Sequence, residues 1–342
     1  MNIEEKFNEF YNKFLIDNQN SFDEIEHFRQ NSIKERKQNK FLTILSIIVW
    51  LSLFIFITNF FDIKNNEDIE SIAMFVLNLT WILPAFIAIF RRKEMFEYDK
   101  IYKEKVISNL IKYFSHTLSY YPNEGLTSED LKEIEFNTFN RFHSSNLIKG
   151  IYLNDEINIS AVTSDYKAGT SSRSTTRPVF YGLLTKFKLS ENSNLNLYLK
   201  NKKNTSRNFT INQISKYNIN INFLKNILTK MEINELNDIF DIYSSNPELT
   251  EKILDPIFIE KLIDIFNKIK FEFYIKDYYI YMKFWIEGLF SIPTPEKETF
   301  EKTVLFKNFE ILYIIFNLIS NFKKQLNLSK IKKAQKDRPF VL

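Results

Sequence analysis

An uninterrupted apolar run at residues 41–61 constrains this chain more than any other feature of the sequence. The run contains no charged residue. At about 1.5 Å per residue, a helix of this length reaches roughly 30 Å, the thickness of a bilayer's hydrocarbon core. A signal peptide is excluded, because the run starts far into the chain and no small-residue cleavage site follows it. The run therefore predicts a transmembrane helix.

A second apolar run at residues 69–90 follows after a short polar link and carries one charge, Glu70, at its edge. Pro84 predicts a kink, which a membrane helix tolerates when neighbouring groups satisfy the freed carbonyl. Asn78 and Thr80 are expected to face the first run, since polar side chains lack partners in lipid. Two buried helices of a soluble protein are the alternative. The length and spacing of the runs favour a two-helix transmembrane hairpin.

The charges around the two runs predict their orientation. Residues 62–70, the link together with the first two residues of the second run, hold one lysine among four acids. Basic residues flank the pair on both outer sides, namely Lys34, Arg36, Lys37, Lys40, Arg91, Arg92 and Lys93. Because Lys and Arg stay on the cytoplasmic side, both termini are placed there. The abundance of Asn, Lys, Ile and Phe is typical of an AT-rich bacterial genome, so we expect a two-pass protein of the bacterial inner membrane.

The remainder of the chain predicts an α+β cytoplasmic domain on an antiparallel sheet, with long helices flanking the hairpin. Strands and helices occur there without regular alternation. The clearest strand pair is an alternating aromatic hairpin at residues 270–285, which turns near Lys276 and Asp277. A helix is expected at 94–118, and another, interrupted at Pro256, follows residue 246. The expected order is an amphipathic N-terminal helix (1–40), the hairpin (41–90), the cytoplasmic domain (91–322) and a basic tail (323–342).

No residue pattern predicts a catalytic, cofactor or metal site. The chain has no cysteine, and its five glycines form no phosphate-binding loop. The three histidines, His27, His116 and His143, lack the i+3 or i+4 spacing of metal ligands. Residues 170–177 mix hydroxyls with two arginines and could bind phosphate, although a flexible loop is the favoured interpretation. Catalytic residues therefore stay unknown, and no cofactor is expected.

Aromatic side chains are abundant, with 35 Phe and 17 Tyr. Two helical stripes are candidates for apolar surface left over after the core is made, and such surface would dock a second copy or another membrane protein. Packing of these stripes on the chain's own domain is the alternative. The candidate interaction residues are Phe7, Phe10, Phe14, Phe309, Leu312 and Phe316.

The net charge of +4 is concentrated at the C-terminus. From Lys323 onward seven basic residues stand against one acid, so the rest of the chain carries about −2 and is not a nucleic-acid surface. A solvated tail is the favoured interpretation, contact with anionic membrane lipid is the second, and contact with nucleic acid is the third. The candidate lipid-contact residues are Lys330, Lys332, Lys333, Lys336 and Arg338.

The order of segments resembles a known bacterial family, domain of unknown function 3137. The hairpin is followed by "YKEKVISNLIKYF", "YYPNEGL", "LIKGIYLNDEINISAVTSDY", "VFYGLLTKF", "FDIYSSNPELTEKILDPIFIEKL" and "FYIKDYYIYMKFW". The resemblance covers roughly residues 100–320 and implies a membrane-attached cytoplasmic domain. The family usually carries an acid where this chain has Ala161, and a polar motif that is reduced here at residues 185–188. No catalytic residue is carried over.

These observations favour a membrane-anchored cytoplasmic protein that binds or scaffolds other proteins, and they do not favour an enzyme. The first alternative is a membrane-tethered enzyme, such as a hydrolase that uses carboxylates or serine. A small membrane-perturbing effector ranks last, because the two runs offer few polar residues to line a pore.

Overall fold

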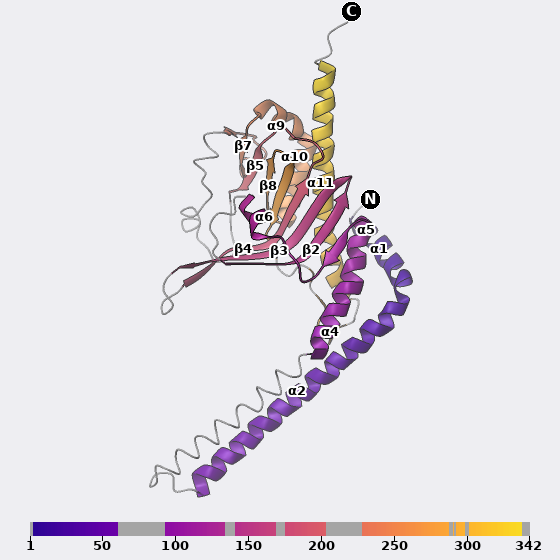
Figure 1. Cartoon of the computed structure of the whole chain (residues 1–342), viewed down its shortest axis with the longest axis vertical. Coiled ribbons are helices and arrows are strands. Elements are labelled where there is room, and N and C mark those ends of the chain that lie inside the picture. The colour runs from indigo at the N-terminus through magenta and orange to yellow at the C-terminus, as the bar shows by residue number, and fades with distance from the viewer. Residues whose placement is uncertain are drawn as a thin grey trace, which may run out of the picture. The chain divides into compact units, whose positions relative to one another are not determined.

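The computed structural model describes residues 3–60, 93–133, 141–168, 175–202, 228–286, 290, 292–297 and 301–336. These residues form helices and an antiparallel sheet, which confirms the predicted α+β class (Figure 1). The predicted second span at residues 69–90 lies outside them. The two-helix hairpin is therefore not shown.

The helices follow the sequence periodicity with a few local differences. Asn18 separates the first two helices, and Pro256 begins a new helix, the latter as the sequence predicts. The helix predicted over residues 94–118 ends at Phe114 and contains a π-helical segment, Lys103–Ile107. The described α-helices are α1 (Ile3–Asp17), α2 (Gln19–Phe60), α4 (Lys93–Tyr102), α5 (Ser108–Phe114), α6 (Ser128–Glu133), α9 (Pro247–Ile253), α10 (Pro256–Lys268) and α11 (Lys302–Lys336).

Among the described residues, nine strands form one antiparallel sheet in the order β1-β2-β3-β4-β9-β8-β5-β7-β6. The predicted aromatic hairpin is confirmed as β8 and β9, which turn through Asp277 and Tyr278. Asp277 has a φ of 54°, the left-handed conformation that a tight turn requires. The strands are β1 (Ser119–Tyr121), β2 (Arg141–Tyr152), β3 (Asp155–Ala168), β4 (Thr175–Lys188), β5 (Leu197–Asn201), β6 (Thr229–Met231), β7 (Phe240–Ser244), β8 (Phe271–Lys276) and β9 (Tyr279–Phe284).

The chain divides into two compact units, and each is discontinuous in sequence. Unit 1 consists of Met1–Phe10, Ile107–Ser291 and Phe306–Leu342, whereas unit 2 consists of Tyr11–Val106 and Ile292–Leu305. The four segments expected from the sequence instead follow one another along the chain.

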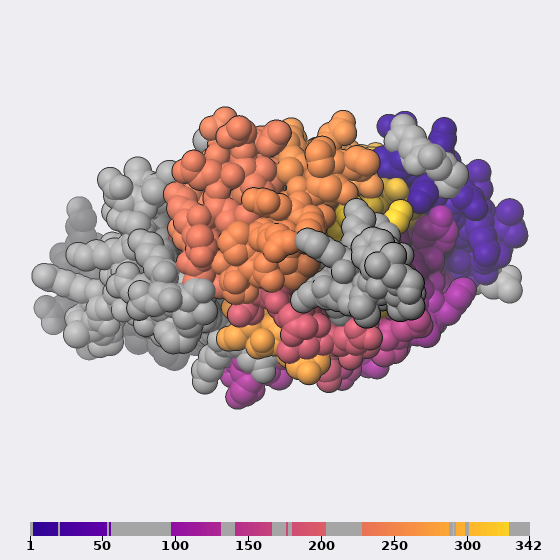
Figure 2. Space-filling model, turned by 90° about the horizontal axis from the view of Figure 1, so that it is seen from above, coloured from indigo at the N-terminus to yellow at the C-terminus, as the bar shows by residue number. Residues whose placement is uncertain are grey.

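One part of the core of unit 1 lies between one face of the sheet and helices α10 and α11 (Figure 1). Phe322 of α11 packs 4.6 Å from Phe273 of β8 and 5.8 Å from Phe258 of α10, measured between ring centroids. Phe266 of α10 packs 5.0 Å from Phe240 of β7. These pairs bury large aromatic area in edge-to-face and tilted geometries. Residues 228–286, drawn in salmon to orange, form one continuous surface in Figure 2.

Helix α11 is the main apolar helix of this core. Within the described residues, one helix, Lys302–Asn327, is long and apolar enough to cross a membrane by length and composition. More than half of it is buried. Its stripe of Leu305, Phe309, Leu312 and Phe316 is at most 2% exposed. This stripe is therefore packed within the protein's own core, in a helix that also carries charged Lys307 and Glu310.

Unit 2 is built from the later part of α1, helix α2, helix α4 and the segment 292–305. Helix α4 lies alongside the first half of α2 (Figure 1). Phe14, Ile25, Tyr98, Tyr102 and Val106 are buried here. An apolar core therefore holds these helices together.

Candidate functional site

Helix α2 is continuous across the boundary between a charged segment and an apolar segment of the sequence. The sequence predicts an amphipathic helix up to residue 40 and a span from residue 41, and the structure joins both in one 42-residue helix. The first part carries all of the charged residues of α2, whereas the second part carries none. We treat α2, together with the groups that hold its first part in unit 2, as the candidate site.

One stripe of the first part of α2 is buried. Ile25, Arg29, Ser32 and Arg36 follow one another at spacings of four, three and four residues, which places them on one side of a helix. Ile25 and Ser32 are at most 1% exposed. The two arginines on this stripe therefore point toward other parts of unit 2.

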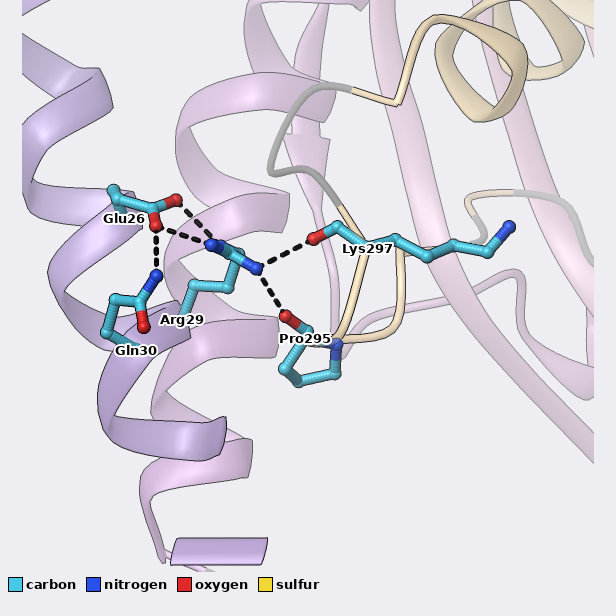
Figure 3. Close-up of polar contacts among 5 residues, drawn as sticks. All are labelled: Glu26, Arg29, Gln30, Pro295 and Lys297. Atoms are coloured by element: carbon cyan, nitrogen blue, oxygen red, sulfur yellow. Dashed lines mark hydrogen bonds and ion pairs between the residues drawn. The ribbon is translucent and has the colours of Figure 1, made fainter. Parts of the chain in front are cut away.

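Arg29 clamps α2 to the segment 292–297 (Figure 3). Its Nη1 donates to the carbonyl oxygens of Pro295 and Lys297, at 2.6 and 2.9 Å. Its Nε and Nη2 donate to both carboxylate oxygens of Glu26, at 2.7 and 2.6 Å, and Gln30 also donates to Glu26. Hydrogen bonds that involve charged groups contribute about 1.5–3 kcal/mol each. The guanidinium thus ties two segments that are far apart in the sequence.

A second arginine reinforces this clamp. Arg36 donates to both carboxylate oxygens of Glu296, at 2.7 and 2.8 Å. The hydrogen bond from Arg36 is the main reason that the pKa of Glu296 is lowered from its usual range. Tyr98 of α4 also reaches this segment, with its hydroxyl 3.4 Å from the carbonyl oxygen of Pro293. Residues 293–297 are therefore held from both α2 and α4.

Ionisable groups of α4 lie in this buried environment. Burial raises the pKa of Asp99, and the charges of Lys103 and Arg36 only partly offset that effect. Burial also raises the pKa of Tyr98 and of Tyr102 well above their usual range. The Tyr102 hydroxyl is buried without a hydrogen-bond partner. These tyrosines stay neutral at physiological pH and act as packing groups.

The second part of α2 exposes its apolar side chains. Eight large apolar residues between positions 41 and 55 are each exposed by 44–65%. At about 100° per residue they cover an arc of roughly 200° around the helix. They are Phe41, Ile44, Leu45, Ile47, Ile48, Val49, Leu51 and Ile55. So wide an exposed apolar surface marks an interaction site for a partner or a membrane.

Three hydroxyl groups in the described portion of this apolar part are satisfied within the helix. Thr43 donates to the carbonyl oxygen of Asn39 at 2.8 Å, Ser46 to that of Thr43 at 2.8 Å, and Ser52 to that of Ile48 at 2.9 Å. A hydroxyl bonded to a carbonyl of the preceding turn needs no water. These hydroxyl groups therefore add no unpaired polar group to the exposed apolar surface.

Polar groups of the sheet in unit 1 pair with one another. Buried Glu272 lies 3.5 Å from Lys283 on the neighbouring strand and accepts a hydrogen bond from the Tyr198 hydroxyl at 3.3 Å. Lys186 pairs with Asp130 at 2.8 Å and lies 4.9 Å from the centre of the Tyr279 ring. Opposite charges paired in this way neutralise each other, so these groups serve packing.

Asp130 also caps a helix. Thr127 donates from its backbone nitrogen and its hydroxyl to Asp130, both at 2.9 Å, and the backbone nitrogen of Asp130 lies 3.3 Å from the Thr127 hydroxyl. These bonds form a reciprocal capping box at the start of α6. Burial raises the pKa of Asp130, but hydrogen bonds from Lys186 and Thr127 outweigh burial and lower it overall.

The six predicted interaction residues, Phe7, Phe10, Phe14, Phe309, Leu312 and Phe316, are all buried, at most 4% exposed. In unit 1, Phe309 packs 5.4 Å from Phe7 and 5.5 Å from Phe10, and Phe316 stacks 5.0 Å from Phe114. In unit 2, Phe14 packs 6.2 Å from Phe22. Packing on the chain's own core, the alternative interpretation, accounts for them. These six side chains therefore leave no exposed surface for docking.

The predicted basic tail begins inside a helix. Helix α11 continues to Lys336, past the expected boundary at residue 323. Lys323 is not part of a free tail, because it pairs with buried Asp155 at 2.5 Å within unit 1. The side chains of Lys330, Lys332, Lys333, Lys336 and Arg338 lie outside the described residues, so their lipid contact stays a prediction.

Three other expectations concern metal, histidine and phosphate chemistry. Within the part of the chain that the structure describes, no group of three His, Asp or Glu residues could hold a metal ion. His143 lies exposed in β2 rather than in a loop. Most of the loop at residues 170–177 lies outside the described residues. The functional feature that sequence reasoning missed is the Arg29 clamp, because a backbone carbonyl acceptor leaves no signal in the sequence.

Comparisons with known proteins add little to this geometry. No protein-family model matches the chain, and no curated protein matches it. A solved structure, that of the mycobacterial trehalose monomycolate transport factor A, TtfA, matches with 8% sequence identity and a TM-score of 0.33. That match covers 63% of this chain and 95% of the other. A similarity this weak supports no conclusion about fold or function.

Proposed function

We propose that this chain is a membrane-anchored protein in which α2 enters the bilayer from Phe41 onward. The exposed apolar surface between Phe41 and Ile55 carries this proposal. Removing apolar area from water stabilises by about 25 cal/mol per Å², and lipid tails remove it without a protein partner. The described side chains of this part end at Ile55, short of the roughly 20 residues that a span requires. The apolar sequence continues to residue 61 and completes that length.

The proposed topology has two spans, residues 41–61 and 69–90, with both termini in the cytoplasm of a bacterial cell. The lysines and arginines on the outer flanks of the two runs support this orientation. The α+β domain then lies in the cytoplasm. We infer that it binds or scaffolds a partner, either a second copy or another membrane protein. The Arg29 clamp supports an anchoring role, since it fixes the cytoplasmic part of α2 rather than leaving it a loose tether.

Cysteine labelling tests this proposal, because the chain contains no cysteine of its own. Position 65 lies between the two apolar runs, outside the described residues, whereas Ile16 is 75% exposed and Ile257 is 65% exposed. Asn65→Cys should react with an impermeant thiol reagent on intact cells. Ile16→Cys and Ile257→Cys should react only after permeabilisation. Labelling of Ile257→Cys on intact cells would overturn the orientation, and extraction of the protein by alkaline carbonate would overturn the anchoring.

A further inference from the structure

We propose that Lys34, Lys37 and Lys40 of α2 form a binding surface for the phosphate headgroups of anionic phospholipids at the cytoplasmic side of the bilayer. The inference rests on the proposed function, since it takes the apolar part of α2 to be inserted. It goes further by naming the lipid class and the three residues that select it.

The charge of α2 is divided between two sets of residues. Arg29 and Arg36 are used within unit 2, where they donate to Glu26, Glu296 and backbone carbonyls. Lys34, Lys37 and Lys40 are exposed, and within the described part of the chain none of them has an ion-pair or hydrogen-bond partner. Three neighbouring ammonium groups repel one another. An external anion would relieve that repulsion.

Lys37 lies on the lipid-facing side of the helix, and at about 100° per residue Lys34 and Lys40 fall roughly 60° to either side of it, with Lys40 toward the stripe that contains Arg29. Lys37, Ile44, Ile48 and Ile55 follow one another at spacings of seven, four and seven residues, so they share one stripe. This stripe is roughly 100° around the helix from the buried stripe that contains Arg29. Along one side of α2, cations therefore give way to exposed apolar side chains at the boundary between Lys40 and Phe41. That order matches the order of headgroup and acyl chain in a lipid.

The spacing along the helix matches the range of the membrane's surface charge. Six residues separate Lys34 from Lys40, a rise of about 9 Å. The Debye length at physiological ionic strength is about 8 Å, so all three ammonium groups feel an anionic surface located near Phe41. Each flexible lysine stem can also extend along apolar surface to bring its ammonium group to the headgroups.

The full-length protein, reconstituted into phosphatidylcholine vesicles, provides the test. Spin-labelled phosphatidylglycerol and spin-labelled phosphatidylcholine report the relative association of anionic and zwitterionic lipid with the protein. We expect the wild-type chain to prefer phosphatidylglycerol. Lys34→Gln/Lys37→Gln/Lys40→Gln should reduce this preference, by at most about fivefold for each lysine. Raising NaCl to about 0.5 M should reduce it as well, because the Debye length then falls to a few ångströms.

A matched variant tests whether the lipid preference depends on these three lysines or on the positive charge of the protein in general. Lys230→Gln/Lys252→Gln/Lys268→Gln removes three exposed lysines of unit 1, whose side chains are 45–56% exposed, and should leave the preference unchanged. Deletion of residues 329–342 removes the C-terminal basic residues. The proposal is overturned if the α2 variant keeps the wild-type preference, or if only the deletion abolishes it.

Two further measurements identify the source of the anion and distinguish failure of this inference from failure of the proposed function. Millimolar glycerol phosphate, added in solution, should not displace the lipid if the surface binds a headgroup in the membrane, and full displacement would contradict a membrane source. Vesicle flotation after alkaline carbonate reports insertion independently. A chain that floats without lipid preference overturns this inference alone, whereas a chain that does not float overturns the proposed function.

Discussion

Five cations lie between residues 29 and 40 of α2, and their chemistry differs with their surroundings. Arginine occupies the two positions where several oxygens must be bound at fixed angles, since its planar guanidinium carries five donors. Lysine occupies the three exposed positions, where a flexible point charge is sufficient. Arg29→Lys would keep the charge, yet one ammonium group cannot reproduce four bonds to Glu26, Pro295 and Lys297.

Asp130 gives a residue-scale prediction about pH. Its folded-state pKa is lowered, so its pairing with Lys186 contributes stability above the unfolded-state pKa of about 3.9 and loses that contribution as pH falls through the folded value. Asp130→Asn should therefore unfold at lower urea than wild type at pH 7, and the difference should shrink at about pH 3. Urea titration of the detergent-solubilised chain measures it.

The control for this prediction is Asp264→Asn. Asp264 pairs with Lys268 on the surface of α10, and its side chain is 65% exposed. Exposed pairs of this kind contribute about 0–1 kcal/mol. A difference between Asp130→Asn and wild type that persists unchanged at acidic pH would show that helix capping, rather than the charge, explains the effect.

At the scale of elements, α1 shows the largest difference between the role expected from the sequence and the role seen in the structure. Its apolar face follows the helical period, and the sequence predicts correctly that this face is buried or docked. The helical period does not identify the surface on which this face packs, because the partner residues Phe309 and Tyr113 are remote in sequence. The structure uses α1 as core.

This burial predicts a loss of stability rather than a loss of assembly. Phe7→Ser and Phe10→Ser should each destabilise the chain by about 3–5 kcal/mol, the usual cost of truncating a buried phenylalanine. Ile16→Ser, on the same helix but 75% exposed, should be nearly neutral. Urea unfolding and light scattering of the same samples measure both properties. Variants that unfold like wild type but no longer assemble would restore the docking interpretation.

Elements with a strong local pattern were predictable, and pairings across the chain were not. The hairpin of β8 and β9 follows from alternating aromatics within a short stretch, and Pro256 fixes the start of α10. By contrast, β5 pairs with both β7 and β8, and nothing in "LYLKN" specifies those neighbours. The apolar part of α2 was readable from composition, whereas the clamp at Arg29 depends on carbonyl groups that every residue carries.

At the scale of the whole molecule, neither unit is a continuous piece of chain. Unit 1 needs the first ten residues as well as Phe306–Leu342, and unit 2 needs Ile292–Leu305 as well as Tyr11–Val106. A soluble fragment that starts after the second apolar run would therefore lack Phe7 and Phe10. It would expose Phe309, which both of them contact.

The contact of Phe7 with Phe309 also fixes an order of events on the ribosome. Phe7 leaves the exit tunnel early, but Phe309 is translated roughly 15–60 s later at ordinary rates of synthesis. Under the proposed anchoring, the apolar part of α2 is available for insertion during that interval, while unit 1 cannot close. We expect nascent chains arrested before residue 300 to keep a protease-sensitive N-terminus, whereas released full-length chains should protect it. Protection in the arrested chains would show that the first helix finds another partner before its own C-terminal one exists.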